Sequence, residues 1–530
     1  MFATKSETFV HIDANGHYVM ATEVVWFKRD LRTYDNPPLV EASESGEQVA
    51  CIFLIEPERL DQPDCDPIHI EWELDCAIEL RRELENLGGS LDIRNEDAIS
   101  ALAEIHSKNV ISTIRSHEET GTEWSFDRDR RVRRWCRENG IDWVEYPSNG
   151  VIRGLRNRDK WKSSRDQRMR LELIDPPRQI NGLPMDTAIP TMELLGLERR
   201  GVLHRPKPGQ EAAIETLESF LLVRGESYRW AMSGPSQATI HCSRLSPYLS
   251  AGCISMRRVV QKTSARMRHL REKRSEGQDT ERWLKSLSSF QSRIAWHCHF
   301  MQKLEDEPTL DKTAQNPLID KNLNRELDEK KFEAWSEGRT GWPFFDACMR
   351  SLIATGWINF RMRAMLMSAA SYNLWLPWRE TGLHLARQFL DYEPGIHWSQ
   401  VGMQSGTTGI NSIRAYSVTK QGRDHDPKGA FIRTWIPELN QVPDEYIHEP
   451  WKMPASFQTE SDCVIGVDYP HPIVDEASTR KEGVRMTYAA RRGEEAREAS
   501  KRVYHKHGSR RRPGNRKRSK ELDKNQTKLF

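Results

Sequence analysis

The sequence predicts two successive folding units, an α/β domain with a doubly wound parallel sheet and then an all-α domain. From residue 23 to 150, short apolar runs rich in β-branched and aromatic residues alternate with segments of helical period. That alternation is typical of βαβ units, in which helices cover both faces of a parallel sheet. After residue 208, strand patterns nearly vanish and helical spacing dominates.

The first unit, residues 23–150, is expected to hold five strands and the helices between them. Each strand prediction rests on a short apolar run, and each helix prediction on a 3.6-residue period. The expected strands are 23–27, 48–55, 91–94, 110–114 and 141–146, and the clearest helices are 68–87 and 124–138.

Three further segments complete the predicted organisation. Residues 151–208 are rich in Pro, Gly and Arg and are expected to form a surface linker. Residues 209–480 are expected to form the helical domain, with helices at 210–223, 255–276, 280–303, 343–354, 357–376 and 380–390. In residues 481–530 the apolar content falls, which predicts a basic, partly helical and partly disordered tail.

Charge and cysteine usage restrict the class of protein. The net charge is +2, but residues 501–530 carry twelve Lys or Arg against Glu521 and Asp523, so the first 500 residues sum to −8. Attraction of the folded body to nucleic acid would therefore need a local basic patch. The nine cysteines include no C-x-x-C pair, and no metal site is expected. No run of 18 apolar residues and no secretory signal pattern occurs, which predicts a cytoplasmic protein without a membrane span.

Three sequence segments are patterned beyond what generic helices and loops require. They are WFKRDLRTYDNPPL at 26–39, SRLSPYLSAG at 243–252 and GRTGWPFFDACMRSLIATGW at 338–357, the last followed by IPEL at 436–439. In this order and spacing they resemble the DNA photolyase and cryptochrome family over nearly all of residues 23–450. The resemblance implies an α/β antenna domain and an all-α domain that binds FAD.

The expected FAD site combines a phosphate-binding segment with a buried ion pair. The hydroxyls of Ser243 and Ser246 fall three residues apart at the start of a helical stretch, where free backbone N–H groups favour a phosphate. By resemblance, Arg363 and Asp391 pair beside the flavin ring, where a guanidinium favours an anionic reduced flavin. The residues assigned to FAD by this resemblance are Tyr228, Cys242, Ser243, Arg244, Leu245, Ser246, Arg363, Asp391, Tyr392 and Glu393.

Three of the seventeen tryptophans match the family's electron-transfer chain. The resemblance implies that Trp398 is proximal to the flavin, Trp378 is in the middle, and Trp335 is distal, at the surface.

The expected DNA-facing wall departs from the family pattern. By resemblance it holds an aromatic residue suited to stacking on an extrahelical base, here Trp296. Repair enzymes carry Glu where this chain has Arg293, Asn where it has Phe360, Met where it has Ala364, and Trp where it has Gln400. The residues assigned to DNA binding are Arg293, Trp296, Phe300, Phe360, Arg361 and Gln421.

The resemblance leaves more than one function open. The first is a deoxyribodipyrimidine photo-lyase, in which blue light drives electron transfer from reduced FAD to a pyrimidine dimer, with the cyclobutane type favoured. The alternative is a cryptochrome-type blue-light photoreceptor without repair activity, and a third is a nucleotide-binding module without photochemistry. A folate or deazaflavin antenna chromophore is also implied.

The expected partners follow from the same resemblance and from the tail. UV-damaged DNA is the expected substrate of a monomeric protein. The C-terminal QTKLF resembles peptides that dock on the bacterial sliding clamp, with Gln526, Leu529 and Phe530 as its contacts. A plain basic tail that binds DNA phosphates is the competing interpretation.

Overall fold

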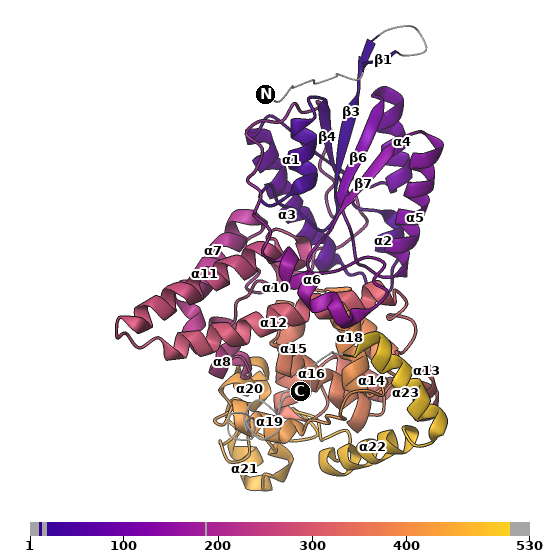
Figure 1. Cartoon of the computed structure of the whole chain (residues 1–530). Helices are drawn as coiled ribbons and strands as arrows, with labels where there is room; N and C mark the ends of the chain where they lie inside the picture. Colours follow the sequence, from indigo (N-terminus) through magenta and orange to yellow (C-terminus); the bar gives the residue numbers. More distant parts are fainter. Residues whose placement is uncertain (1–9, 13–17, 186–187, 509–530) are drawn as a thin grey trace.

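The computed structural model describes residues 10–12, 18–185 and 188–508. Figure 1 shows an α/β domain stacked on a helical domain, with the carboxyl ends of the strands pointing toward the helices. No helix among these residues has the length and apolar character needed to cross a membrane. Gln526, Leu529 and Phe530, the residues expected to contact a sliding clamp, lie outside the described ranges, as does the tail from residue 509 onward.

The α/β domain contains the five expected strands in a parallel sheet of order β5-β4-β3-β6-β7. The alternation of apolar runs and helices therefore predicted the doubly wound topology correctly. The sheet strands are β3 (Thr22–Phe27), β4 (Gln48–Leu54), β5 (Leu91–Arg94), β6 (Ile111–His117) and β7 (Asp142–Tyr146). A separate antiparallel pair precedes them, formed by β1 (Val10–Ile12) and β2 (Tyr18–Met20).

Helices cover both faces of the sheet because its strands are apolar on both sides. One face packs with α3 and continues into the first part of the helical domain, and the other packs against α4 and α5. The helices of this domain are α1 (Pro37–Glu44), α2 (Pro57–Leu60), α3 (Pro67–Asn86), α4 (Ala98–Lys108) and α5 (Glu123–Glu138).

The linker expected at residues 151–208 packs against both domains. The amide N of Leu183 donates to the carbonyl O of Val49 at 2.9 Å, and the amide N of Leu203 donates to Ala354 O at 2.8 Å. It contains one short α-helix, α6 (Trp161–Arg168). Because its backbone bonds reach both units, the linker helps to fix their relative position.

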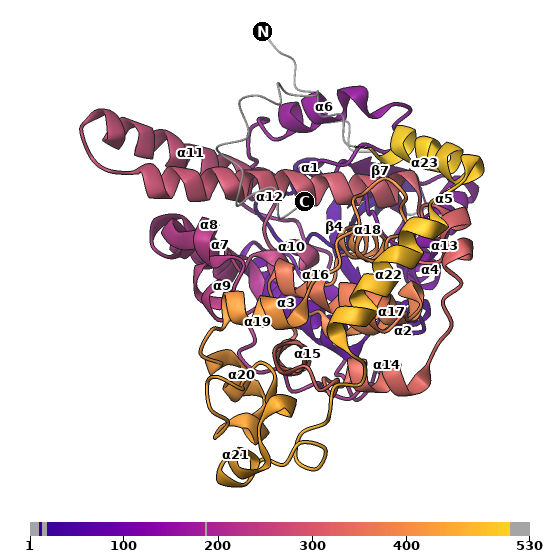
Figure 2. The ribbon, with the colours of Figure 1, turned by 90° about the horizontal axis from the view of Figure 1, so that it is seen from below.

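The helical domain is built around α12, which crosses it as a long central element (Figures 1 and 2). Gly395 lets α18 approach this helix closely, because a Cβ at that position would lie 2.7 Å from Met301 Cα. Its helices up to that contact are α7 (Gly209–Leu222), α8 (Tyr228–Ala231), α9 (Pro235–His241), α10 (Ser246–Ala251), α11 (Met256–Ser275), α12 (Glu281–Asp306), α13 (Pro317–Leu323), α14 (Glu329–Ser336), α15 (Pro343–Thr355), α16 (Phe360–Ser368), the π-helical η3 (Ala369–Asn373), α17 (Trp378–Gln388) and α18 (Pro394–Ser405).

The helical domain continues past the boundary expected at residue 480, which falls inside α22. The later helices are α19 (Val418–His425), α20 (Ala430–Trp435), α21 (Ala455–Glu460), α22 (Glu476–Ala490) and α23 (Glu494–His507). Figure 2 shows α22 and α23 lying along the helical domain, where α22 contacts η3 and α23 contacts α13. The boundary expected at residue 480 therefore falls within a helix, and both α22 and α23, which are separated at residues 491–493, pack on the body of the protein.

Gly252 lies at a close contact between the two domains. It ends α10 with a φ of +76°, and a Cβ there would lie 2.0 Å from the carbonyl O of Arg29 in the loop after β3. The amide N of Leu31 in this loop donates to Ala251 O at 3.1 Å. Only glycine therefore fits at this junction.

We expect Gly252→Ala to destabilise the protein by at least about 2 kcal/mol, because it adds a steric clash to an unfavourable backbone conformation. The matched control is Gly46→Ala, which has a φ of +85° and no atom within 4 Å of the added Cβ. The control should lose only about 1 kcal/mol. Chemical denaturation measures both, and equal losses would contradict this account of the junction.

Candidate functional site

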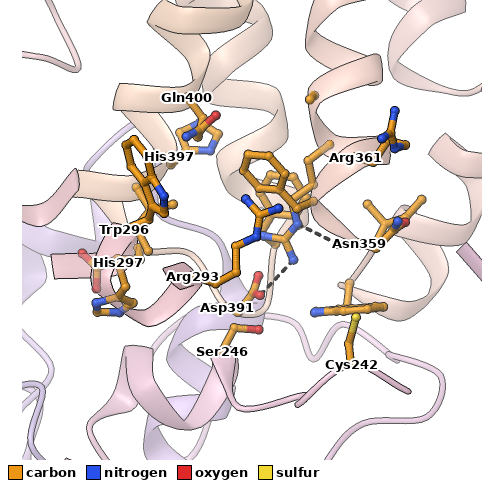
Figure 3. Close-up of a pocket in the computed structure, with 18 of the residues that line it drawn as sticks. Cys242, Ser246, Arg293, Trp296, His297, Asn359, Arg361, Asp391, His397 and Gln400 are labelled. Atoms are coloured by element: carbon orange, nitrogen blue, oxygen red, sulfur yellow. Dashed lines mark hydrogen bonds and ion pairs between the residues drawn. The ribbon is translucent and has the colours of Figure 1, made fainter. Parts of the chain in front are cut away.

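A cavity of about 310 Å³ lies within the helical domain. Its wall comes from α12, α16, α18 and the segment that joins α9 to α10. Figure 3 shows Trp296, His297 and His397 on one side, Cys242, Asn359 and Arg361 on the other, and Arg293 and Asp391 between them. All ten residues assigned to FAD by sequence line this cavity, as do Arg293, Trp296, Phe300, Phe360 and Arg361.

The expected phosphate-binding segment forms a turn between two helices. Helix α9 ends at His241 and α10 begins at Ser246, so Ser243 lies in the turn and Ser246 opens the helix. Arg244 within the turn has a φ of +61°. The two hydroxyls therefore reach the cavity from a turn and from the helix start that follows it.

Arg244 carries the charged hydrogen-bond donor of this turn. Its guanidinium stacks on the Trp357 ring at 3.7 Å, and its Nη1 atom is buried without a hydrogen-bond partner among the described residues. Burial lowers the pKa of Arg244 to about 10, with Asp391 acting in the opposite direction. The side chain therefore stays charged at neutral pH, and its unsatisfied donor favours an anionic ligand in the cavity.

The expected ion pair between Arg363 and Asp391 is present. Nη2 of Arg363 lies 2.8 Å from Oδ2 of Asp391, and Nε of Arg363 donates to Ile358 O at 2.7 Å. Asp391 is 6% exposed, and its Oδ1 atom has no partner in the described part of the chain. One carboxylate oxygen therefore orients the guanidinium, and the other is left to interact with a ligand.

Glu393 joins the cavity to the α/β domain. It lies at the N-terminus of α18, and its carboxylate is 3.1 Å from Nη2 of Arg29, in the loop after β3. Burial raises the pKa of Glu393, and the charge of Arg29 opposes that shift. The WFKRDLR segment thus supports the cavity wall from the neighbouring domain.

The assigned DNA-contacting residues divide into a cavity wall and its support. Trp296 stacks on Phe300 with ring centroids 5.4 Å apart, and Phe300 is only 5% exposed. Phe360, at the start of α16, is 38% exposed. Gln421 does not line the cavity and accepts from Nη1 of Arg361 at 3.4 Å. Gln421 therefore supports Arg361 from outside the cavity, and Phe300 lines the cavity as a stacking partner of Trp296, whereas Trp296 and Phe360 offer the more exposed aromatic surface.

The tryptophans expected to form an electron-transfer chain are only partly placed as expected. The rings of Trp398 and Trp378 meet edge to face at 6.0 Å, one layer behind the cavity wall. Trp335 is 0% exposed and packs against Phe332 and His384. The expectation that Trp335 is the surface end of the electron-transfer chain is therefore wrong. Its ring points from α14 into the apolar core that α14 shares with α17.

Sequence reasoning missed two features of the wall, His297 and the stacking of Trp357 on Arg244. Burial lowers the pKa of His297 to about 4 and that of His397 to about 3. Both imidazoles are therefore neutral at pH 7, and Nε2 of His397 lies 2.9 Å from Gly382 O. A signal for His297 was available, because it adjoins Trp296 on a predicted helix, whereas the Trp357 contact joins distant segments.

The donor set fits a polar, anionic ligand that also carries a ring system. Within the described part of the chain, the buried polar atoms without a hydrogen-bond partner include Nη1 of Arg244, Oδ1 of Asp391, Oδ1 of Asn359 and Oε1 of Gln404, and aromatic rings line the same cavity. A flavin dinucleotide offers both a pyrophosphate and a hydrogen-bonding ring to such a site. No cluster of three or more metal-binding side chains occurs in residues 10–12, 18–185 and 188–508.

Comparisons with known proteins agree with this geometry. Residues 23–156 match the family model described as DNA photolyase, and residues 290–489 match the model described as the FAD binding domain of DNA photolyase. A deoxyribodipyrimidine photo-lyase of Vibrio cholerae is 28% identical over 491 residues, covering 88% of this chain and 99% of the relative. Cryptochrome-2 of Arabidopsis thaliana is 30% identical over 491 residues, covering 86% and 77%. The crystal structure of a Synechocystis cryptochrome shares the fold, with a TM-score of 0.79 and 23% identity over 89% of this chain and 100% of that one.

We expect Arg244→Ala to weaken FAD binding by about 10- to 100-fold, because hydrogen bonds to charged groups contribute about 1.5–3 kcal/mol. Fluorescence titration of free FAD into the flavin-depleted protein measures this affinity. The control is Arg282→Ala, which removes an exposed arginine of the same domain outside the cavity. An affinity equal to that of the control would show that Arg244 does not contact the dinucleotide.

Proposed function

Because the chain belongs to the DNA photolyase and cryptochrome family, we propose that it is a light-driven lyase that repairs cyclobutane pyrimidine dimers in UV-damaged DNA. The observation that carries this proposal is the cavity itself. It combines unpaired polar atoms suited to a flavin dinucleotide with an aromatic and basic wall suited to an extrahelical base pair.

The residues that would hold FAD are those of the turn and of the buried ion pair. Ser243, Arg244 and Ser246 would bind the pyrophosphate, and Arg363 with Asp391 would lie against the ring. When bound and reduced, FAD excited by blue light supplies one electron to the dimer and recovers it after ring opening, so no net oxidation occurs. The chain contributes position, charge and exclusion of water.

The electrostatics of the wall favour a negative charge within the cavity. Arg244 and Arg363 are cationic, and the guanidinium of Arg293 lies 5.9 Å from the centroid of Phe360. His297 and His397 are held neutral by burial, so they are poor proton donors to a reduced ring. This environment favours the anionic form of a reduced flavin.

Damaged DNA would approach the wall that carries Trp296. Its indole and the exposed ring of Phe360 offer faces on which an extruded base can stack, and Arg361 supplies a cation beside them. The negative body charge means that DNA affinity depends on this patch and on the basic C-terminal segment. All nine cysteines are free thiols, which supports action in the reducing cytosol.

A cryptochrome-type photoreceptor is the second candidate, favoured by the altered wall. Gln400 and Ala364 line the cavity where repair enzymes carry larger lesion-packing side chains. The Trp398–Trp378 contact provides the start of an electron path away from the ring. In this reading, light would reduce the bound flavin through these tryptophans and alter the exposure of the C-terminal segment.

An antenna chromophore in the α/β domain is part of the same proposal. A cavity of about 130 Å³ lies beside the carboxyl ends of β3, β6 and β7, with Arg32, His117 and Tyr146 in its wall. Ligands of doubly wound sheets bind at this edge. A folate or a deazaflavin would absorb light there and pass the energy to the helical domain.

We expect the reduced, FAD-loaded protein to restore thymine absorbance in an oligonucleotide with one cyclobutane dimer under blue light. Trp296→Ala should weaken binding of this oligonucleotide by about 10-fold, since stacking contributes about 1–3 kcal/mol per base. The control is Trp230→Ala, which removes an exposed tryptophan outside the cavity. Full binding of the damaged oligonucleotide without recovery of absorbance would reject repair in favour of the photoreceptor.

A further inference from the structure

A hydrogen-bonded chain leads from a buried indole to a carboxylate at the domain boundary. Nε1 of Trp398 donates to the hydroxyl O of Tyr392 at 2.9 Å, and this hydroxyl donates to Oδ2 of Asp64 at 2.5 Å. Trp398 and Tyr392 belong to the helical domain, whereas Asp64 lies between α2 and α3 of the α/β domain. The two domains therefore meet in one short proton path.

The Tyr392 phenol and the Trp378 indole both contact Trp398. Tyr392 lines the cavity, whereas Trp398 does not. The ring centroids of Trp398 and Trp378 are 6.0 Å apart. A positive hole on Trp398 thus has two neighbours that could fill it, the indole of Trp378 and the phenol of Tyr392. Trp335 is buried and offers no exit to solvent.

The neighbours differ in how they can release a proton. A buried phenol gives up an electron readily only if its proton leaves with it, because a phenol radical cation would be an uncompensated buried charge. Asp64 accepts directly from the Tyr392 hydroxyl, whereas Nε1 of Trp335 donates to a backbone carbonyl, that of Leu366, at 3.0 Å. Nε1 of Trp378 donates to Oδ2 of Asp320 at 3.0 Å, which makes Trp378 the competing site.

Two further observations suit the Tyr392–Asp64 pair to proton transfer. Burial, reinforced by the charge of Asp64, raises the pKa of the Tyr392 hydroxyl well above its usual range, so the phenol keeps its proton at rest. Asp64 also lines a cavity of about 70 Å³ between the domains, which is large enough for ordered water. A proton received by Asp64 therefore has an onward path.

We propose that Tyr392 is a terminal electron donor of this protein and that Asp64 is the base that takes its proton. Trp398 loses one electron to a photoexcited oxidised flavin in the cavity and becomes an indole radical cation. Tyr392 then passes one electron to Trp398 as its O–H bond breaks and the proton moves to Asp64. The result would be neutral Trp398, a neutral tyrosyl radical and a protonated Asp64 carboxyl, with the electron that Tyr392 lost held by the flavin. This inference rests on the flavin-binding part of the proposed function and not on repair.

Flash photolysis of the full-length protein loaded with oxidised FAD tests the assignment, with transient absorption and electron paramagnetic resonance identifying the radical. In the wild type we expect the long-lived radical to be tyrosyl. In Tyr392→Phe it should be a tryptophan radical. In Asp64→Asn the tyrosyl radical should form about 100-fold more slowly or not at all, since a positioned base contributes about 10²–10⁴-fold.

The matched control is Tyr372→Phe, which removes the hydroxyl of another buried tyrosine. Tyr372 is 1% exposed, and its hydroxyl has no hydrogen-bond partner within the described ranges, so its loss should leave the tyrosyl signal unchanged. If Tyr392→Phe binds no FAD, Asp64→Asn still tests the base, because Asp64 does not line the FAD cavity.

The outcomes separate this inference from the proposed function. A wild-type tryptophan radical whose lifetime changes in Asp320→Asn would overturn it and place the hole on Trp378. A wild-type tyrosyl radical that survives in Tyr392→Phe would overturn it as well. Failure to bind FAD in the wild type would remove the proposed function and this inference together, whereas a tyrosyl radical without dimer repair would reject repair alone.

Discussion

The buried charged loop after β3 is the constraint on which the relation of the two domains depends. Lys28, Arg29 and Asp30 follow an apolar strand, and because Lys28 and Asp30 are buried and Arg29 is half-buried, each charge needs a partner. Lys28 pairs with Asp129 at 3.2 Å, Arg29 with Glu393 at 3.1 Å and Asp30 with His117 at 2.6 Å. Because Glu393 belongs to the cavity wall, the α/β domain supports the site through the Arg29–Glu393 ion pair.

The cavity is defined as much by unpaired atoms as by its shape. Arg244 and Asp391 each retain a buried polar atom that no other described residue satisfies, which folded proteins seldom tolerate unless a ligand or water takes that place. The same wall carries aromatic side chains from α12 and α16, so polar and stacking surfaces face one space. This combination suits a flavin dinucleotide, and it supports the proposal that an extruded base pair binds beside it.

Sequence patterns predicted the sheet and most helices, because the period of the apolar residues follows directly from which faces of an element are buried. The assigned FAD residues also converge on one cavity, although their individual contacts are proposals. The helices after residue 480 were underestimated because they bury small side chains such as Ala490, Ala496 and Ala499, which leave a weak apolar signal. Neither the burial of Trp335 nor the Asp64–Tyr392 bond could be predicted, because both depend on contacts between segments distant in sequence.

The visible absorption spectrum of the purified protein, before and after reconstitution with FAD, shows whether the cavity binds a flavin. We expect a flavin band in the blue, in stoichiometric amount, that bleaches under blue light when an electron donor is present. A folded protein that is colourless and takes up no FAD on reconstitution would contradict this expectation, because the unpaired atoms of the cavity would then serve another ligand.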